Sequence, residues 1–410
     1  MRICLLSYRG NPYCGGQGVY IYHLARELRY LGHEVYVLSG PPHPDLNGFA
    51  EIRRLESLSL YDPGSSFWGG LYRARSPLKL FEFLATCFGT FPEPFTFSIR
   101  AYRKLLELHS QQRFDIVHDN QCLGYGLLLM KRLGIPVVAT IHHPISIDRK
   151  LALSQVSGRR DRFRIKRWYS FIEMQRRISS RLDRIITVSQ NSAEDIKRCF
   201  NVSEDKLRVI YNGVDTDFFK GNGGLARQPN SIIAVDSGSQ HVKGTRYLLQ
   251  ALYLLKQRGD GKTRLTLVGK GGPDSELAAL VREYGLDDAV TFTGVISQEE
   301  LLRYYSTAEV AVVPSLYEGF GLPAAEAMSC GLPLVVSSAG ALPEVVGEDG
   351  QSGLLVPPAD PDALATAIRR LLSDEGLRES MGRAGRDRAK REFSWRRAAQ
   401  ETVRVYEECL

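Results

Sequence analysis

Two glutamates eight positions apart carry the strongest chemical signal in this chain of 410 residues. Glu318 lies in a glycine-rich turn, and Glu326 lies about one turn into a helix expected to begin near Pro323, because proline favours the first turn of a helix. Free N–H groups of such a turn and helix start can hold a diphosphate, and the two carboxylates can accept hydrogen bonds from sugar hydroxyls. The spacing therefore predicts a site for a sugar diphosphate rather than an ordinary surface turn.

Two weaker candidates lie in the first half of the chain. Gly15 and Gly16 form a turn between an expected strand and an expected helix, where glycine lets the backbone approach a ligand closely. A lone glycine pair is a weak signal. His142 follows the apolar run 137–141, and a lone histidine at a strand end is on general grounds more often structural than functional.

The elements that must position these residues alternate between short apolar runs and helical patterns. In the first half the predicted strands are 3–7, 33–39, 114–118, 137–141 and 184–188. In the second half they are 231–236, 263–268, 290–293, 310–314 and 333–337. Continuous apolar strands separated by helices are typical of parallel sheets that are covered on both faces.

A stretch rich in Gly, Asn and Pro, residues 220–230, interrupts this alternation and is predicted to be a linker. We therefore expect an α/β chain with two Rossmann-like domains, 1–215 and 216–392, that face each other across a cleft. The amphipathic helix expected within 393–410 is a candidate to pack back onto the first domain. Ligands of such sheets bind at the carboxyl ends of the strands.

These residues resemble the retaining glycosyltransferases of family 4, also called group 1, which have the GT-B fold. Glu318 and Glu326 match the E-x7-E signature of that family, and the resemblance covers nearly the whole chain. The other matching blocks are 15–16, 209–215, 242–244, 267–271, 331–333 and 353–357. Each block is weak by itself, but their order and spacing together are specific.

The resemblance implies a role for each candidate. Glu318 is expected to contact the donor sugar ring, and Glu326 the ribose of the nucleotide. Lys243 matches the phosphate-binding lysine of the family, and His142 matches a position that faces the donor sugar, which favours a catalytic role over a structural one. The remaining expected donor-binding residues are Gly15, Gly16, Gly319, Phe320, Gly321 and Leu322.

Two local features bear on the expected charge of the site. The arginine that the family usually has shortly before its lysine is missing from 238–243, so His241 or another cation would replace it, or the donor would bind more weakly. Asp215 and Asp217 spell D-x-D, the metal–nucleotide motif of a different glycosyltransferase fold, but they lie where turn-forming aspartates are common. We therefore expect no metal and no cofactor besides the nucleotide-sugar substrate.

Basic residues are concentrated in one part of the chain. Residues 1–215 contain 31 Lys and Arg against 20 Asp and Glu, a net charge of +11, whereas the whole chain carries +7. The segment 149–184 contains 12 basic and 3 acidic residues, a net charge of +9. This segment is either a solvated face or a surface for an anionic membrane or acceptor, with Trp168 and Phe171 as expected anchors. Nucleic acid is not expected, because no nucleic-acid-binding module accompanies the charge.

The expected location is the cytoplasm; if 149–184 is a membrane surface rather than a solvated face, the protein would dock on the inner face of the membrane. The seven cysteines are scattered and form no C-x-x-C pair, a pattern typical of reduced thiols. The chain contains no run of 18 apolar residues, so we expect no membrane-spanning helix. The first residues lack the apolar core of a signal peptide.

The expected activity is the transfer of a sugar from a nucleotide-diphosphate donor to a hydroxyl of a glycan, a glycolipid or a small molecule, with retention of configuration. Two alternatives stay open: a catalytically silent nucleotide-sugar-binding protein, and a sugar phosphorylase or epimerase with the same fold. The residues leave the nucleotide, the sugar and the acceptor open.

Overall fold

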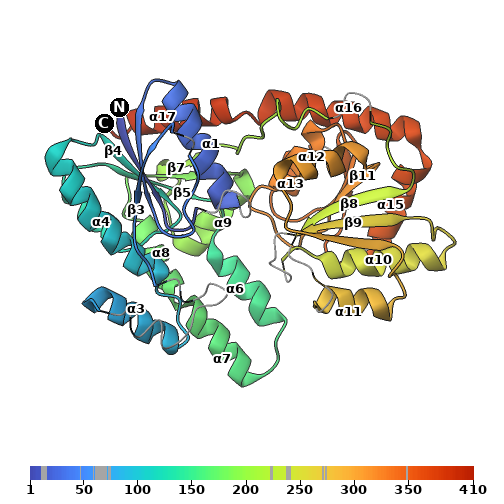
Figure 1. Cartoon of the computed structure of the whole chain (residues 1–410), viewed down its shortest axis with the longest axis horizontal. Helices are drawn as coiled ribbons and strands as arrows, with labels where there is room; N and C mark the ends of the chain where they lie inside the picture. Colours follow the sequence, from blue (N-terminus) through green and yellow to red (C-terminus); the bar gives the residue numbers. More distant parts are fainter. Residues whose placement is uncertain are drawn as a thin grey trace. The chain divides into compact units, whose positions relative to one another are not determined.

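A computed structural model describes the chain except residues 11–15, 47, 59, 61–71, 73–74, 222–224, 237–241, 270–271, 273–274 and 348–349. The described residues form two compact units (Figure 1). Unit 1 comprises Met1–Ile210 and Ala398–Leu410, and unit 2 comprises Tyr211–Arg397. Each unit is built around a parallel sheet, which confirms the predicted pair of α/β sheets. In the described part of the chain, no helix is long and apolar enough to cross a membrane.

Unit 1 contains a seven-stranded parallel sheet with the order β3-β2-β1-β4-β5-β6-β7. Its strands are β1 (Arg2–Ser7), β2 (Glu34–Ser39), β3 (Glu51–Arg54), β4 (Ile116–Asn120), β5 (Val137–Ile141), β6 (Arg184–Thr187) and β7 (Leu207–Val209). Every residue of β4 and β5 is buried, as expected for central strands covered on both faces. The strand order reverses between β1 and β4, which is where ligands of such sheets bind.

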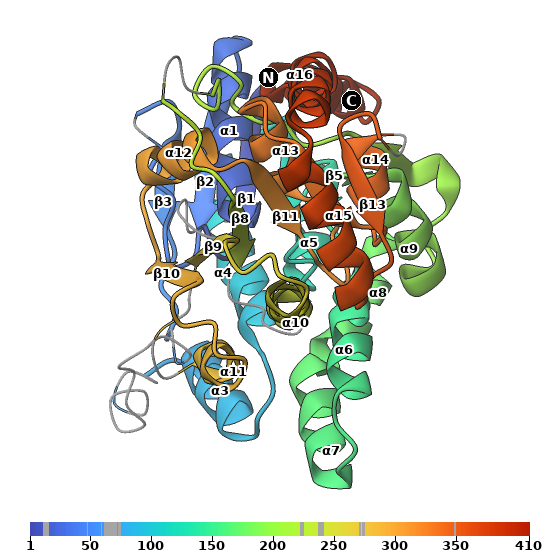
Figure 2. The ribbon, with the colours of Figure 1, turned by 90° about the vertical axis from the view of Figure 1, so that its right-hand side faces the viewer.

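Besides the last helix of the chain, eight helices of unit 1 lie along this sheet or extend from it. They are α1 (Gly16–Tyr30), α3 (Pro77–Cys87), α4 (Glu93–Gln111), α5 (Gly126–Lys131), α6 (Ile145–Ser154), α7 (Arg159–Trp168), α8 (Ile172–Ser179) and α9 (Gln190–Phe200) within the described part. Single 3-10 turns cover Tyr169–Phe171 and Glu204–Lys206. Helices α3, α6 and α7 extend from the same end of this unit (Figures 1 and 2).

Unit 2 contains a six-stranded parallel sheet with the order β10-β9-β8-β11-β12-β13. Its strands are β8 (Ser231–Asp236), β9 (Arg264–Gly269), β10 (Val290–Gly294), β11 (Val310–Val313), β12 (Leu334–Ser337) and β13 (Gly353–Val356). Its helices are α10 (Thr245–Gln257), α11 (Glu276–Glu283), α12 (Gln298–Thr307), α13 (Leu322–Ser329), α14 (Leu342–Val346), α15 (Pro361–Ser373) and α16 (Glu375–Glu392). Helix α12 begins with a capping box, in which Ser297 and Glu300 satisfy each other's backbone N–H groups.

The last helix, α17 (Trp395–Glu407), starts in unit 2 and belongs to unit 1 from Ala398 onward. In unit 1 the buried Tyr406 hydroxyl lies 2.5 Å from Nδ1 of His118, a fully enclosed residue of β4. The carboxylate of Glu408 pairs with Arg184 at 3.0 Å and Arg208 at 2.6 Å. These contacts fix the C-terminus against β4, β6 and β7.

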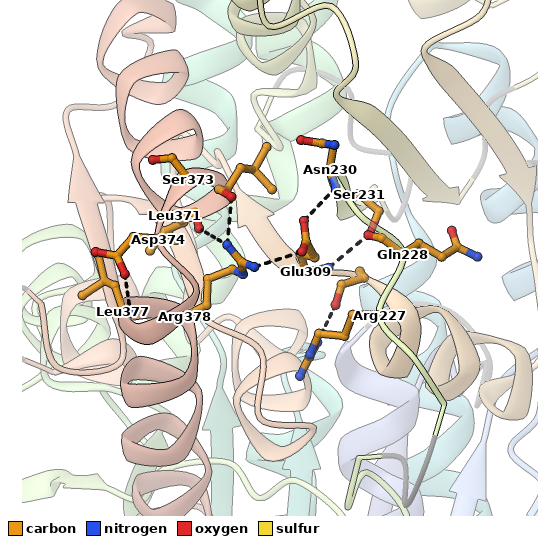
Figure 3. Close-up of polar contacts among 12 residues, drawn as sticks. Arg227, Gln228, Asn230, Ser231, Glu309, Leu371, Ser373, Asp374, Leu377 and Arg378 are labelled. Carbon is orange, nitrogen blue, oxygen red and sulfur yellow. Dashed lines mark hydrogen bonds and ion pairs between the residues drawn. The ribbon is translucent and has the colours of Figure 1, made fainter.

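A largely buried ion pair lies at the N-terminal ends of two central strands of unit 2 (Figure 3). Arg378 donates to Glu309 at 3.0 Å and to the carbonyl oxygens of Leu371 and Leu372, both at 2.8 Å, at the end of α15. The other oxygen of Glu309 accepts the N–H of Asn230 at 2.7 Å. The two charged side chains are only 14% and 12% exposed, so the pair joins the starts of β8 and β11 to helices α15 and α16 in a largely dry environment.

Candidate functional site

A lysine and a glutamate from neighbouring loops of unit 2 meet at the carboxyl ends of β8 and β11. Nζ of Lys243 lies 2.6 Å from Oε1 of Glu318, and the Ser315 hydroxyl donates to the same oxygen at 2.8 Å. The side chains of Lys243 and Glu318 are 14% and 11% exposed. The structure thus brings together two predicted site residues that lie 75 positions apart in the chain.

Glycines allow these two loops to approach closely. The N–H of Leu316 donates to the carbonyl of Val242 at 2.7 Å, which joins the loop after β11 to the loop after β8. Gly244 has a φ of +66°, and a Cβ there would lie 2.0 Å from the carbonyl oxygen of Pro314. Any larger residue would therefore separate the loops and move Lys243 away from Glu318.

Two helices begin beside this ion pair without a side-chain cap. Helix α10 starts directly after Gly244, and α13 starts directly after Gly321. Gly321 has a φ of +102°, and a Cβ there would lie 2.8 Å from Cδ2 of Leu342. Because the first N–H groups of a helix lack partners within the helix, these two starts can bind phosphate oxygens.

The second predicted glutamate, Glu326, lies on α13. The hydroxyl of Tyr305 lies 3.2 Å from Oε2 of Glu326 and 3.3 Å from the carbonyl oxygen of Pro323, so it can donate to either. Burial raises the pKa of the Glu326 carboxyl to about 7, although the Tyr305 hydrogen bond acts in the opposite direction. At neutral pH this carboxyl is therefore close to half ionised.

The remaining residues of the predicted turn have different surroundings. The ring of Phe320 is 4% exposed and packs edge-on against Phe393 at 5.3 Å, so only its backbone is left to meet a ligand. Gly319, Gly321 and Leu322 present main-chain groups between Glu318 and the start of α13.

In unit 1, His142 follows β5 and is held by the end of the neighbouring strand β4. Its Nε2 lies 2.8 Å from Oδ1 of Asn120, and Nδ2 of Asn120 donates to the carbonyl of Gln17 at 3.1 Å. The Asn120 oxygen is thus the acceptor, which assigns the ring proton to Nε2. Burial, with smaller contributions from His143 and His118, lowers the pKa of His142 to about 3. The ring is therefore neutral at physiological pH, and its Nδ1 can accept a hydrogen bond.

The backbone around His142 is fixed by Gln121. Oε1 of Gln121 accepts the N–H of His142 at 2.7 Å, and its Nε2 donates to the carbonyl of His143 at 2.8 Å. Gln121 adopts a left-handed φ of 58°, a conformation that costs free energy outside glycine and is often found at functional sites. Nε2 of His143 lies 3.1 Å from Asp148 of α6.

Three sequence expectations concern residues near these sites. Gly16 is the first residue of α1, whereas Gly15 and His241 lie outside the described residues. Oδ1 of Asp215 accepts the N–H of Phe218 at 3.1 Å, a turn-forming contact. Among the described residues, no group of three or more His, Cys, Asp or Glu side chains could hold a metal ion.

Sequence reasoning missed the residues that hold the candidates in place: Ser315, Tyr305, Asn120, Gln121 and Gly340. Gly340, in the loop after β12, has a φ of +57°, and a Cβ there would lie 2.2 Å from the carbonyl oxygen of Glu318. Apart from Ser315, which lies three positions before Glu318, each of these residues acts through a partner 21 or 22 positions away, so the local signal for it was weak.

Both halves of the chain match known protein families. Residues 14–218 match the family described as Glycosyltransferase Family 4, and residues 215–388 match Glycosyl transferases group 1. An MMP alpha-(1->4)-mannosyltransferase from Mycolicibacterium hassiacum is 45% identical over 412 residues, covering 100% of this chain and 98% of the relative. A glycogen synthase from Mycobacterium tuberculosis is 29% identical over 420 residues, covering 99% and 94%. The chain belongs to the group 1 glycosyltransferases, family 4.

Solved structures show the same architecture. A sucrose-phosphate synthase from Thermosynechococcus elongatus has a TM-score of 0.76 and 26% identity, with 100% of this chain and 99% of that chain covered. HepE from Anabaena, solved in complex with UDP and glucose, has a TM-score of 0.71 and 18% identity, with 99% of each chain covered. The expected GT-B fold of two Rossmann-like domains is confirmed, and the chain is a glycosyltransferase.

Proposed function

We propose that this glycosyltransferase moves a mannosyl residue from a nucleoside-diphosphate donor to a hydroxyl of an acceptor glycan, with retention of the α configuration. The observation that carries the donor assignment is the Lys243–Glu318 pair beside two uncapped helix starts. The 45% identity to a mannosyltransferase over the whole chain supports mannose as the sugar and an α-(1→4) linkage as the product.

The chemistry follows from what each group can stabilise. Lys243 and the starts of α10 and α13 offer positive potential to the departing diphosphate, and they are already in place before the reaction begins. The carboxylate of Glu318 can face the sugar ring as positive charge develops at its anomeric carbon. The neutral His142 ring can accept a hydrogen bond from a sugar hydroxyl.

The transfer needs no strong protein base in this scheme. The bond between the anomeric carbon and the leaving phosphate oxygen breaks, and the bond to the acceptor oxygen forms on the same face of the sugar. The acceptor proton goes to the leaving phosphate oxygen. The diphosphate, now neutralised in part by Lys243, is thus both leaving group and base.

The donor can be identified by thermal unfolding of the protein with UDP-, GDP- and ADP-sugars, followed by turnover measurements. A ligand at one hundred times its Kd stabilises the folded state by about 2.7 kcal/mol. For a unit of this size we expect the transition to rise by about 5–10 °C with the correct donor. A panel in which GDP-mannose and the other mannose donors neither shift the transition nor turn over would contradict the mannosyl assignment.

The same assay tests our proposal that transfer needs no metal. Because Lys243 and the helix starts carry the charge that a divalent ion would otherwise supply, EDTA should leave turnover almost unchanged. Asp217→Ala should have a mild effect. Loss of activity with EDTA and its recovery with manganese would contradict this part of the proposal.

If the Glu326 carboxylate accepts hydrogen bonds from the ribose of the donor, the affinity for the nucleotide sugar should rise as the pH rises through the pKa of Glu326. The carboxyl has a pKa of about 7, so it is mostly protonated at pH 6 and mostly ionised at pH 8. Hydrogen bonds to the ionised form are about twice as strong, so we expect Kd to fall roughly fivefold over this range. Glu326→Ala should weaken binding by about 1.5–3 kcal/mol.

The matched control is Glu326→Gln, which keeps the shape of the side chain but cannot ionise. Kd should be measured by titration calorimetry with the intact nucleotide sugar. Its diphosphate carries a sugar at each end, so no phosphate group of the ligand titrates between pH 6 and pH 8. An equally steep pH dependence in Glu326→Gln would show that another group is responsible.

We further propose that the protein works in the cytoplasm with no nucleic-acid partner. The described cysteines Cys4, Cys87, Cys122, Cys199, Cys330 and Cys409 are all free thiols, as is typical of a reducing compartment.

A further inference from the structure

Helix α3 presents apolar side chains outward, which is the reverse of the usual arrangement for a surface helix. Its inner face buries Phe83 and Glu82, the latter hydrogen-bonded to Ser57 at 2.9 Å. Its outer face exposes Leu80 by 42%, Leu84 by 46% and, at the end of the helix, Phe88 by 63%. Large apolar side chains exposed together in this way mark a site of interaction.

Helix α7 is a basic helix that buries none of its residues. Five of its cations are exposed, and one of them, Arg162, donates to the carbonyl oxygens of Leu153 and Val156. The other four are Arg159, Arg160, Arg164 and Lys166. Among the described residues, no carboxylate lies within ion-pair distance of any of these four. Phe163, on the same helix, is 61% exposed.

The apolar outer face of α3 and the basic face of α7 are continuous. The guanidinium of Arg167 lies 5.9 Å from the ring centre of Phe88 on α3 and 5.7 Å from that of Phe163 on α7. Figures 1 and 2 show both helices at the same end of unit 1. We define the α3–α7 surface as Leu80, Phe81, Leu84, Phe88, Phe163, Arg159, Arg160, Arg164 and Lys166.

This surface differs from the one expected from the sequence. Trp168 and Phe171 pack against Phe91, with ring centres 5.2 and 5.4 Å apart, so they attach the end of α7 to the body of the unit instead of serving as outward anchors. The expectation for these two rings was wrong. Downstream of α7, the Arg176 and Arg177 side chains are paired with Glu173.

We propose that the α3–α7 surface docks on an anionic lipid bilayer. Apolar side chains on α3 and Phe163 can enter the interface between headgroups and acyl chains, while the four cations of α7 meet anionic headgroups. A second copy of the chain fits less well, because it would bring two sets of unpaired cations together. The proposal goes beyond the transfer reaction and is tested by binding, so its outcome is independent of the proposed function.

The test is co-sedimentation of the full chain with vesicles of phosphatidylcholine alone and of phosphatidylcholine mixed with phosphatidylglycerol. We expect binding to the mixed vesicles only. Raising the salt from about 0.1 M to about 1 M should weaken it, because the Debye length falls from about 10 Å to about 3 Å. Equal binding to both kinds of vesicle, or none to either, would overturn the proposal.

Two variants separate the charged and apolar contributions. In the first, Arg159→Gln/Arg160→Gln/Arg164→Gln/Lys166→Gln, binding should fall by roughly a hundredfold or more, since each cation near an anionic surface contributes a factor of about five. In the second, Leu80→Ser/Leu84→Ser/Phe88→Ser, binding should fall although the net charge is unchanged.

A matched control removes four exposed cations elsewhere: Arg370→Gln/Lys390→Gln/Arg396→Gln/Arg404→Gln. This control should bind like the wild type. If it lost as much binding as the α7 variant, net charge rather than the α3–α7 surface would be responsible. Sedimentation equilibrium gives the second readout. If the wild type is a dimer that does not bind vesicles, and the apolar variant is a monomer, the surface is a self-association face and the proposal is overturned.

Discussion

Glu318→Ala should lower kcat by roughly 10²–10³-fold, the usual effect of removing one preorganised group that stabilises transition-state charge. The carboxylate is already oriented by Lys243 at 2.6 Å and Ser315 at 2.8 Å, so the site loses a charge placed before the reaction begins. Initial rates at saturating donor measure this effect on the chemical step separately from donor binding.

Two variants of the same contact serve as controls. Glu318→Gln keeps an oxygen that can accept from Lys243 and Ser315 but removes the charge, so its loss of kcat should approach that of Glu318→Ala. Ser315→Ala keeps the charge and the Lys243 contact and removes one hydrogen bond to the carboxylate, worth about 1.5–3 kcal/mol at most, so its effect on kcat should be smaller than that of Glu318→Ala. Glu318→Ala with the kcat of the wild type, or with a loss no larger than that of Ser315→Ala, would contradict a direct role in catalysis.

Arg378→Ala should destabilise unit 2 by about 3–5 kcal/mol, because it leaves a largely buried carboxylate on Glu309 without its partner. The carbonyl groups at the end of α15 lose their donor as well. For a unit of this size, calorimetry should show its transition lowered by roughly 6–20 °C.

The control lies on the same helix. Arg383 pairs with Glu379 at 3.4 Å, but these side chains are 72% and 61% exposed. An exposed pair contributes about 0–1 kcal/mol, so Arg383→Ala should leave the transition almost unchanged. Equal shifts in the two variants would mean that the buried network of Figure 3 contributes little to stability.

The central strands could be predicted from the sequence because burial on both faces requires a continuous apolar run. Two edge strands of unit 1 were missed. β3 has the sequence Glu-Ile-Arg-Arg and none of its residues is buried, so it carries no apolar run. β7 has only three residues, and an arginine separates its two apolar side chains, so it carries no apolar run either.

The candidate site could be predicted only where its pattern is local. Glu318 and Glu326 lie on one turn and the helix that follows it, so their spacing is visible in the sequence. The Lys243–Glu318 pair depends on β8 and β11 being neighbours in the sheet, which no local pattern encodes. The same is true of Asn120 and His142, which meet because β4 and β5 are adjacent.

The roles of Trp168 and Phe171 show how a helical pattern can mislead. A spacing of three places two side chains on one face of a continuous helix. Both rings do lie on one side here, since each packs against Phe91, but that side faces the body of the unit, which the spacing does not encode. The exposed ring of this region is Phe163, one turn earlier.

The most direct test of the proposed reaction is the configuration of the new glycosidic bond. Proton NMR can follow the product as it forms from the donor with the highest turnover and a glycan acceptor. We predict that the first product carries the α linkage of the donor and that a nucleoside diphosphate is released in equal amount. A β-linked first product, transfer to free phosphate instead of a hydroxyl, or a bound donor that is never consumed would contradict a retaining glycosyltransferase reaction at Lys243 and Glu318.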